Sequence, residues 1–369
     1  MTLPLLASTA VPSHAIRVMV VDDAVVVRGL VSRWVSEEPD LVVVGTCGNG
    51  REAVENLDRL DPEVVVLDIE MPVLDGLGAL PLMLAKRPNL VVVMASTVTR
   101  RNAEISLRAL ALGAADYVPK PESNREITTS QSFRRELIDK IRHLGRRRHL
   151  RRTPRSAEAA DAAPAPIRLR PFSKLPPRAL CIGCSTGGPQ ALQVVARGLM
   201  PVLERLPVLV AQHMPPTFTA ILAEHLERET AHPAREGADG EPLAPGTFYV
   251  APGGRHMRVE TRGSAPVIAL DDSPPVHFCR PAVDPLFASA AATFGAGTLA
   301  MLLTGMGSDG AAGAAAIAQA GGSVIAQDEA SSVVWGMPGA AAQAGVCAAV
   351  LPLDEIGPRA ARLVNGERP

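Results

Sequence analysis

Residues 16–23 read IRVMVVDD and residues 63–68 read EVVVLD, two apolar runs that each end in aspartate. Unbroken Val, Ile and Leu runs of this length are typical of strands buried on both faces of a parallel sheet. The same pattern recurs in LVVVG at 41–45, LVVVMA at 90–95 and ADYVPK at 115–120. Segments with apolar residues at helical spacing lie between these runs. We therefore predict a doubly wound α/β domain over residues 16–141, closed by a helix over roughly 132–144.

Residues 178–369 repeat this alternation and predict a second, larger α/β domain of the Rossmann-like kind. Its strand patterns are RALCIG (178–183), PVLVAQH (207–213), TFYVAP (247–252), APVIAL (265–270), TLAMLLTG (298–305), GGSVIAQ (321–327) and VCAAVL (346–351). Helical patterns lie between several of these strands, at 189–199, 218–229 and 309–320. Both domains are thus expected to be doubly wound parallel sheets.

The segments outside these two domains have a different composition. Residues 142–177 are rich in Arg, Ala and Pro and show little periodicity, which is typical of a linker. Such a linker is either a solvated hinge or a basic strip that docks to an acidic partner, and the sequence leaves both open. Residues 1–15 lack the basic start and the long apolar core of a signal peptide, so we expect a short, loose tail.

The composition of the 369 residues argues against several classes of protein. The chain has 37 basic residues, 38 acidic residues and only 11 aromatic ones, so we expect no nucleic-acid partner. No apolar run approaches the roughly 18 residues of a membrane-spanning helix, so we expect no membrane insertion. Five scattered cysteines, an odd number, fit a reducing cytoplasm better than a disulfide scaffold.

Carboxylates gather at the strand ends of the first domain. Asp22 and Asp23 end the first predicted strand and Asp68 ends the third, while Ser96 and Lys120 end the fourth and fifth. The carboxyl ends of parallel strands meet at one edge of the sheet, so these side chains should converge. Three carboxylates repel one another unless a hard cation such as Mg²⁺ neutralises them. Together with the Lys120 ammonium, they predict a site that holds a phosphoryl group on Asp68.

Residues 183–187 read GCSTG, a G-x-S-x-G string between a strand and a helix pattern. A sharp turn of this kind exposes Ser185 beside helix N-terminal amides, which can stabilise an oxyanion. His213 and Asp309 follow two other strands at equivalent positions. The three residues therefore predict a nucleophile, a base and an orienting acid. Their order along the chain differs from the Ser–Asp–His order of α/β-hydrolases and disfavours that family.

Two other strings suggest different chemistry. Residues 305–310, GMGSDG, match a dinucleotide-binding fingerprint, with Asp328 lying 18 residues beyond the last glycine. Against this, Asp309 would place a negative charge beside the pyrophosphate. Residues 181–184, CIGC, suggest redox or zinc chemistry, but no second Cys/His pair follows at zinc spacing.

Residues 16–140 contain VVDD, LDIEMPVLDG, MAST and DYVPKP in order. These motifs resemble the receiver domain of two-component signalling, a flavodoxin-like fold. The resemblance implies that Asp68 is the phosphoacceptor, that Lys120 contacts the phosphoryl group and that Ser96 and Tyr117 form a switch pair. The implied Mg²⁺ ligands are Asp22, Asp23, Asp68 and the Glu70 carbonyl.

Residues 178–355 contain GCSTGGPQAL, QHMPPTFTAILAEHL, REGADGEPLAPGTFYVAPGGRHM, RPAVDPLF and LLTGMGSDGAAG in order. This combination resembles the catalytic domain of the CheB family of chemotaxis protein-glutamate methylesterases, which act as serine hydrolases. The resemblance implies that Ser185 is the nucleophile, His213 the general base and Asp309 its orienting acid. It further implies that the Met306 N–H donates to the oxyanion and that Thr186 lies beside the nucleophile in the oxyanion and substrate site.

The chain departs from this family pattern at Cys184, where Ala is usual, and at Ala282, where Ser is common. Neither difference touches the triad, although both could adjust substrate fit. Four other histidines have no triad role by this resemblance: His225, His232, His256 and His277.

The two resemblances imply a response-regulator methylesterase. Its expected reactions are hydrolysis of glutamyl γ-methyl esters on methyl-accepting chemoreceptors, which releases methanol, and deamidation of specific receptor glutamines. A chemotaxis histidine kinase is the expected phosphodonor for Asp68, and phosphorylation should relieve occlusion of the active site by the receiver. We expect Mg²⁺ at the receiver site, no cofactor for the esterase reaction, and a monomer.

Two other classes of function remain as alternatives. The first is a non-enzymatic signalling adaptor with a degenerate output domain, which the intact Ser185, His213 and Asp309 disfavour. The second is a receiver-controlled oxidoreductase, which rests only on the glycine-rich string at 305–310.

Overall fold

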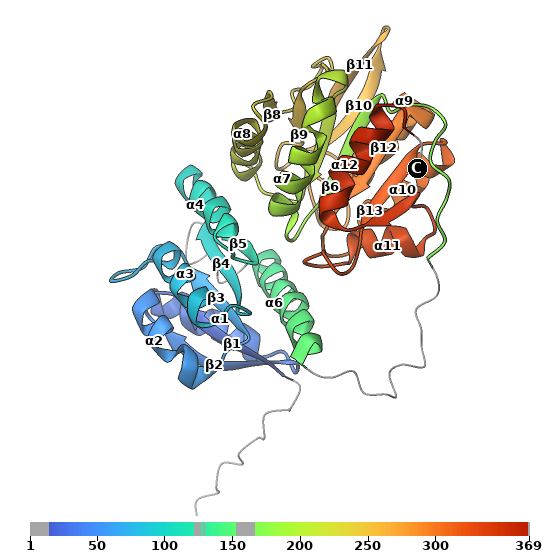
Figure 1. The fold of residues 1–369 in the computed structure, drawn as a ribbon. Helices are drawn as coiled ribbons and strands as arrows, with labels where there is room; N and C mark the ends of the chain where they lie inside the picture. Colours follow the sequence, from blue (N-terminus) through green and yellow to red (C-terminus); the bar gives the residue numbers. More distant parts are fainter. Residues whose placement is uncertain (1–14, 122–126, 128–129, 153–166, 368–369) are drawn as a thin grey trace, which may run out of the picture. The chain divides into compact units, whose positions relative to one another are not determined.

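The computed structural model describes residues 15–121, 127, 130–152 and 167–367, and of residues 147–152 the backbone alone (Figure 1). The chain divides into two compact units, residues 1–97 with 112–159 and residues 98–111 with 160–369. The prediction of a loose N-terminal tail concerns residues that, except for Ala15, lie outside the described ones. The central part of the predicted linker, residues 153–166, lies outside them too.

The first unit is built on a five-stranded parallel sheet with the strand order β2-β1-β3-β4-β5. The strands are β1 (Ile16–Val21), β2 (Leu41–Cys47), β3 (Val64–Asp68), β4 (Val91–Thr97) and β5 (Asp116–Lys120). Every residue of β3 is buried, as a central strand covered on both faces requires. This is the flavodoxin-like strand order, and it confirms the predicted receiver-type fold.

The helices of this fold follow the sequence patterns. Helices α1 (Val25–Ser36) and α6 (Gln131–Arg152) pack together, as do α2 (Gly50–Leu60) and α3 (Gly76–Lys86), while α4 (Arg100–Ala111) connects β4 to β5. Reciprocal hydrogen bonds similar to a capping box begin α2. The Asn49 side chain accepts from the Glu52 N–H, and the Glu52 carboxylate accepts from the Gly48 N–H.

Both ends of the predicted linker are more ordered than its composition suggested. Helix α6 continues past residue 141 to Arg152, and Arg142 donates to the carboxylates of Glu38 and Asp40 at 2.8 Å each. At the other end, the Ser173 N–H donates to Ser323 Oγ and the Ser173 hydroxyl donates to the Ala296 carbonyl, both at 2.8 Å. Such side-chain contacts leave no periodic pattern, so the sequence did not reveal them.

The second unit contains a seven-stranded parallel sheet with the order β14-β13-β12-β6-β7-β9-β8. Its strands are β6 (Ala179–Cys184), β7 (Val208–Gln212), β8 (Ala234–Glu236), β9 (Phe248–Val250), β12 (Thr298–Leu302), β13 (Ser323–Gln327) and β14 (Ala349–Leu351). The chain leaves β6 toward β7, whereas β12 and β13 extend the sheet on the other side. Ligands of open α/β sheets bind at such a switch point, beyond the carboxyl ends of the strands.

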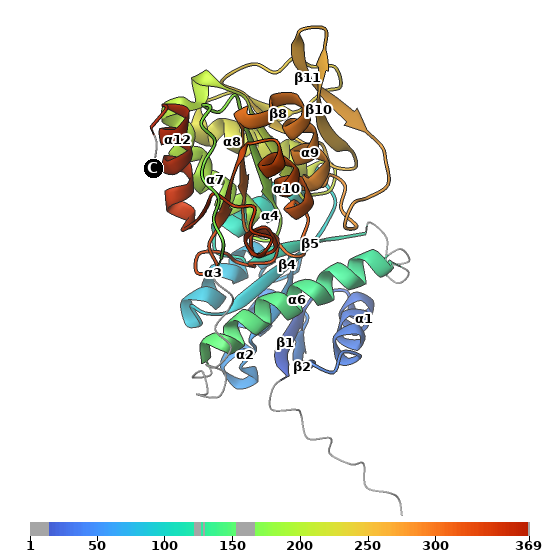
Figure 2. The same ribbon diagram turned by 90° about the vertical axis from the view of Figure 1, so that its right-hand side faces the viewer.

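Two layers of helices cover this sheet, as the crossover rule requires when strands are added in opposite directions (Figure 2). One layer contains α7 (Gly188–Leu199), α8 (Phe218–Thr230) and α12 (Leu353–Val364). The other contains α9 (Val283–Phe294), α10 (Ala311–Gln319) and α11 (Met337–Gln343). The prediction of a larger, doubly wound second domain is therefore confirmed.

One predicted strand lies outside the main sheet. Strands β10 (His256–Arg262) and β11 (Ala265–Asp271) pair antiparallel in a separate two-stranded sheet. The sequence predicted the strand at 265–270 but not β10, because HMRVETR is largely polar and carries a weak apolar signal. Gly263 lies in the hairpin turn with a φ of 64°, a left-handed conformation that favours glycine. Strand β8 was also missed, since three residues are too short for a periodic signal.

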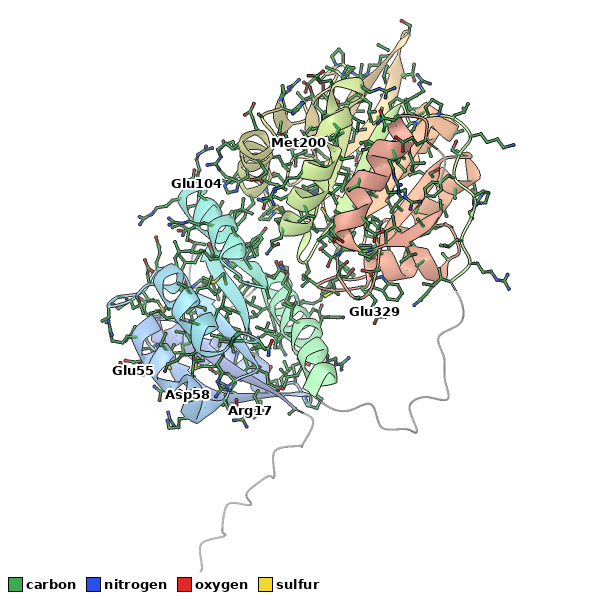
Figure 3. All side chains as sticks on the ribbon, in the orientation of Figure 1. Arg17, Glu55, Asp58, Glu104, Met200 and Glu329 are labelled. Carbon is green, nitrogen blue, oxygen red and sulfur yellow. The ribbon has the colours of Figure 1, made fainter. Side chains whose placement is uncertain are left out.

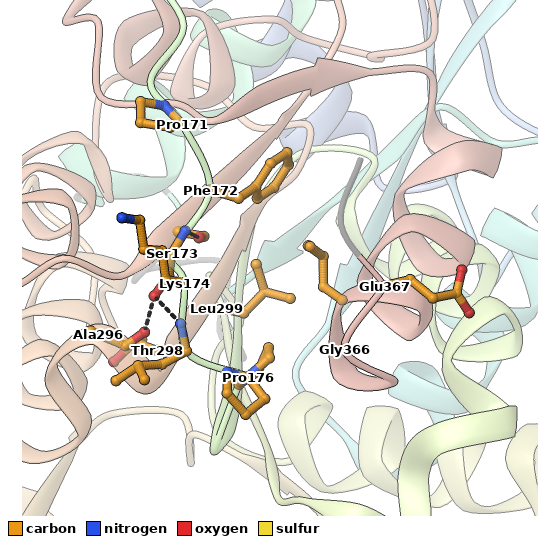
Figure 4. Close-up of a pocket in the computed structure, with 14 residues that line it drawn as sticks. Pro171, Phe172, Ser173, Lys174, Pro176, Ala296, Thr298, Leu299, Gly366 and Glu367 are labelled. Atoms are coloured by element: carbon orange, nitrogen blue, oxygen red, sulfur yellow. Dashed lines mark hydrogen bonds between the residues drawn. The ribbon is translucent and has the colours of Figure 1, made fainter.

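A cavity of about 500 Å³ lies between residues 171–177, the start of β12 and the end of α12 (Figure 4). It is at the amino end of β12, the edge opposite to the one at which ligands of such sheets bind. In the part of the chain that the structure describes, no helix is long and apolar enough to cross a membrane.

Candidate active site and phosphorylation site

Ser185 lies in the turn between β6 and α7, at the carboxyl edge of the larger sheet. Its N–H donates to the Thr304 carbonyl at 3.0 Å, and its carbonyl accepts from the Gly188 N–H at 2.7 Å and from the Gln212 side-chain amide at 3.0 Å. Gly187 has a φ of 73°, which lets the chain turn sharply into the helix. Backbone contacts on both sides therefore hold the side chain of Ser185 at the helix N-terminus.

His213 directly follows β7 and links the other two residues of the predicted triad. Its Nδ1 lies 3.1 Å from Ser185 Oγ, and its Nε2 lies 2.7 Å from Asp309 Oδ2. Because an ionised carboxylate can only accept, we assign the ring proton to Nε2. The lone pair of Nδ1 then points toward the serine hydroxyl. The structure thus brings the three predicted side chains into one continuous chain of hydrogen bonds.

Asp309 lies between the first turns of α9 and α10. Its Oδ2 accepts from the Val283 N–H at 2.6 Å, and its Oδ1 accepts from the N–H groups of Asp284 at 3.0 Å and Gly310 at 2.9 Å. With the His213 ring, four donors surround a side chain that is only 1% exposed. Amides at helix N-termini stabilise negative charge, so this carboxylate is both immobilised and kept ionised.

The same contacts set the protonation of the pair. Burial by itself would lower the pKa of His213, but its contacts with Asp309 and with the side chain of Cys279 outweigh burial and raise this pKa above the usual value of about 6.5. Burial would likewise raise the pKa of Asp309, yet His213 and the two α9 amides lower it. The carboxylate therefore stabilises an imidazolium at His213, the state that forms when a serine proton is taken up.

The loop after β12 passes close to the nucleophile. A Cβ atom at Gly305 would lie 2.9 Å from the Ser185 Cβ and 2.2 Å from Met337 Sδ, so this approach requires glycine. Met306 follows directly, and no hydrogen bond joins its N–H to another of the described residues. Thr186 Oγ1 is buried, also without a hydrogen-bond partner among them. These positions suit an oxyanion site, while the roles of Met306 and Thr186 stay predictions.

A second cluster lies at the carboxyl edge of the smaller sheet. Ligand atoms of Asp22, Asp23 and Asp68 lie within 4.8 Å of one another. Lys120 Nζ lies 2.6 Å from Asp68 Oδ1 and 3.0 Å from Asp22 Oδ2. Burial raises the pKa of Asp68 to about 6, since Lys120 only partly offsets burial and Asp22 raises the pKa further. One ammonium does not neutralise three carboxylates, so this donor set fits a hard divalent cation such as Mg²⁺.

The other predicted receiver residues lie on neighbouring strands or on the loop that follows Asp68. Ser96 and Tyr117 are buried in the neighbouring strands β4 and β5. Burial raises the pKa of Tyr117 well above its usual value, and Lys140 Nζ lies 5.2 Å from the centre of its ring. Glu70 lies two residues after Asp68 and is exposed. The switch and ligand roles of these residues remain predictions.

The glycine-rich and cysteine strings serve other purposes. In the 305–310 string, Asp309 is committed to His213 and the helix amides, which is not the geometry of a pyrophosphate site. Cys181 and Cys184 are buried inside β6, and burial raises the pKa of the Cys181 thiol to about 12. Neither cysteine belongs to a metal-type cluster among the described residues. Redox or zinc chemistry is therefore disfavoured.

Sequence reasoning missed the groups that position the triad. Gln212 holds the Ser185 carbonyl, the α9 amides hold Asp309, and Cys279 contacts His213. The only signals in the sequence were the places of Gln212 within QHMPP and of the α9 amides within RPAVD, with Cys279 directly before RPAVD.

Comparison with known proteins agrees with this geometry. The family model for the CheB methylesterase matches residues 180–360, and that for the response regulator receiver domain matches residues 18–131. A protein-glutamate methylesterase/protein-glutamine glutaminase of Nitrobacter hamburgensis is 60% identical over 363 residues, which cover 95% of each chain. The chain belongs to the CheB methylesterase family. The sequence-based assignment to this family of receiver-linked methylesterases is thereby confirmed.

The chain is also similar to a second curated relative and, over about half its length, to a solved structure. A protein-glutamate methylesterase/protein-glutamine glutaminase of Rhodopseudomonas palustris is 57% identical over a match that covers 98% of this chain and 97% of that protein. The solved catalytic domain of the Thermotoga maritima CheB methylesterase is 36% identical, with a TM-score of 0.49, and covers 51% of this chain and 100% of that domain.

Proposed function

We propose that Ser185, His213 and Asp309 hydrolyse glutamyl γ-methyl esters on chemoreceptors. The observation that carries this proposal is the chain of hydrogen bonds from Ser185 Oγ through His213 to Asp309, with distances of 3.1 and 2.7 Å. Ser185 Oγ attacks the ester carbonyl while Nδ1 of His213 takes its proton. The Met306 N–H and the amides at the start of α7 receive the oxyanion.

The two halves of the reaction use the same groups. His213 returns the proton to the departing methoxy oxygen, so methanol leaves and a glutamyl ester of Ser185 remains. A water molecule then loses a proton to His213 and attacks this ester, which yields glutamate and free serine. A receptor glutamine follows the same route, with ammonia as the leaving group in place of methanol.

We further propose that Asp68 accepts a phosphoryl group from a chemotaxis histidine kinase. Asp22, Asp23 and Asp68, with the Glu70 carbonyl, would hold Mg²⁺, which supplies positive charge to the phosphoryl oxygens when bound. Lys120 contacts the same oxygens, and Ser96 and Tyr117 respond to them. The proposed division of the chain is a receiver at 16–141, a linker at 142–177 and a catalytic domain at 178–369, in a cytoplasmic monomer.

The decisive experiment measures methanol release from receptor membranes that carry methyl-labelled glutamates. The wild-type protein should release methanol faster with a small phosphodonor and Mg²⁺, and Ser185→Ala should release none above background. Glutamine deamidation at the same receptor positions should disappear in the same variant. Methanol release that survives in Ser185→Ala would contradict the assignment of the nucleophile.

A further inference from the structure

Asp284 makes contacts on three sides beside the triad. It is the second residue of α9, and its N–H donates to Asp309 Oδ1 at 3.0 Å. Its own Oδ1 accepts from the Gly313 N–H at 2.7 Å, in the first turn of α10. Its Oδ2 lies 3.3 Å from His277 Nε2. The Asp284 side chain is 14% exposed, whereas the His277 side chain is 46% exposed, so the contact with His277 lies at the solvent-facing side of Asp284.

These contacts differ from those of an ordinary helix cap. A capping aspartate accepts from the first turn of its own helix, whereas Asp284 accepts from a different helix. The two helices also approach closely, because a Cβ at Gly313 would lie 3.2 Å from the Asp284 Cα and 2.5 Å from the Phe287 Cβ. Asp284 therefore holds the N-termini of α9 and α10 at a fixed separation. Asp309 lies between these termini and takes its amide donors from this region of both.

Asp284 also places a second carboxylate beside Asp309. Ligand atoms of His277, Asp284 and Asp309 lie within 4.8 Å of one another. The titratable groups that face His213 are Asp309, before α10, and Cys279, before α9, while Asp284 and His277 lie next to Asp309. Burial raises the pKa of Asp284, and Asp309 adds to this rise while the Gly313 N–H and His277 oppose it. An ionised Asp284 adds a second negative charge next to Asp309, the carboxylate that contacts His213.

We propose that Asp284 is a positioning residue of the esterase site, which fixes Asp309 between the starts of α9 and α10 and makes the His213 imidazolium easier to form. This inference rests on the proposed function of the triad. It predicts two separable effects, because Asn keeps an oxygen that can accept from Gly313 but removes the charge, whereas Ala removes both.

The experiment compares the full-length variants Asp284→Asn and Asp284→Ala with wild type. Methanol release from methylated receptor membranes gives kcat and KM as functions of pH, and an NMR titration gives the pKa of His213 in the same proteins. Asp284→Asn should move the low-pH limb of kcat/KM, and the pKa of His213, toward lower pH by about half a unit or more. Asp284→Ala should also lower kcat by roughly tenfold or more with little change in KM, because Asp309 loses its fixed position.

The matched control is Glu329→Gln, which removes one exposed negative charge from the same unit (Figure 3). Solvent and salt screen such a charge, so neither the pH profile nor the pKa of His213 should move. An unchanged pH profile and an unchanged pKa of His213 in Asp284→Asn would overturn the proposal. The NMR readout does not need turnover, so it tests Asp284 even if methanol release fails and refutes the proposed esterase function.

Discussion

His213 is the residue on which the chemistry proposed for the larger unit depends. It presents Nδ1 to Ser185 and Nε2 to Asp309, so a single neutral tautomer, with its proton on Nε2, can serve as the base. The QHMPP segment gave the identity of this residue, but the ring orientation depends on where Asp309 is held. Four donors around Asp309 fix that position.

Ser185→Ala and His213→Ala should each lower kcat for methylester hydrolysis by roughly 10³-fold or more. The double variant should be little worse than either single variant, because members of one catalytic unit are not additive. Methanol release by the three proteins, with circular dichroism to confirm folding, tests this expectation. Losses that multiply in the double variant would indicate that the two residues act in separate mechanisms.

The rate should depend on pH through His213. Only the neutral ring accepts the serine proton, and contact with Asp309 helps to raise the pKa of His213 above about 6.5. The value of kcat/KM should therefore fall as pH drops through this raised pKa, so its midpoint lies on the alkaline side of an ordinary histidine. In Asp309→Asn the maximal rate should fall, by less than in Ser185→Ala, and the midpoint should move to lower pH.

A pH–rate profile of wild type and Asp309→Asn checks both parts of this expectation. If Asp309 instead belonged to a nucleotide-binding loop, the substitution would change the affinity for a dinucleotide and leave the esterase rate intact. Measuring both quantities on one protein separates these outcomes.

At the scale of elements, the site is made by ends of strands and starts of helices. The turn from β6 into α7 carries Ser185, β7 ends just before His213, and the loop from β12 to α10 carries Asp309. The loop after β12 can approach the serine only because residue 305 has no side chain. Gly305 also anchors the next loop, since its carbonyl accepts from the Met337 N–H at 2.9 Å.

Gly305→Ala should therefore lower kcat by roughly tenfold or more, because the added Cβ pushes the Met306 amide away from Ser185. The midpoint temperature of thermal unfolding should fall modestly, because the added Cβ forces Met337 to move. Gly29→Ala is the matched control, because a Cβ there meets nothing within 4 Å and its helix position favours alanine. Steady-state kinetics and thermal unfolding of both variants give the answer, and a fully active Gly305→Ala would show that the close approach is unimportant for catalysis.

In the molecule as a whole, one chain carries both the proposed phosphoacceptor site and the proposed serine hydrolase site. A short flexible linker, as predicted for part of residues 142–177, keeps the two joined domains at an effective concentration near the millimolar range. Even a weak inhibitory contact between the receiver and the catalytic domain would then be substantially populated. Phosphorylation can relieve inhibition only as far as the two receiver states differ in affinity for the catalytic domain. Regulation is therefore measurable as a difference in the rate of methanol release between the full-length protein and its catalytic domain.

A fragment of residues 167–369 should release methanol faster than the unphosphorylated full-length protein and should ignore the phosphodonor. The fragment begins at residue 167 and not at residue 178, the predicted start of the catalytic domain. The reason is that Ser173 hydrogen-bonds to Ser323 and Ala296 of the same unit. Asp68→Asn in the full chain should stay at the low basal rate with donor and Mg²⁺ present. If the fragment released methanol more slowly than the unphosphorylated full-length enzyme, occlusion of the active site by the receiver would be contradicted. The receiver would then be expected to deliver the substrate.

The two sheets and the candidate residues of both sites could be predicted from the order of residues along the chain. Unbroken Val and Leu runs such as EVVVLD have only one low-energy place, the interior of a parallel sheet, and their aspartates must then lie at its carboxyl edge. Ser185, His213 and Asp309 could be named for the same reason, since each follows a recognisable strand. The spacing of apolar residues and the position at which a strand ends are local properties, so both can be predicted from the sequence.

The contacts that hold those residues could not be predicted in this way and are seen only in the folded chain. The helical start of the predicted linker and the contacts of Ser173 depend on side chains from distant segments. Strand β10 is largely polar and becomes recognisable only through its backbone pairing with β11. The amides of α9 that hold Asp309, and the bridge from Asp284 to α10, join residues that are more than 20 positions apart. Such contacts arise from packing of helices on a common sheet, so their distances and charges become defined only when the chain has folded.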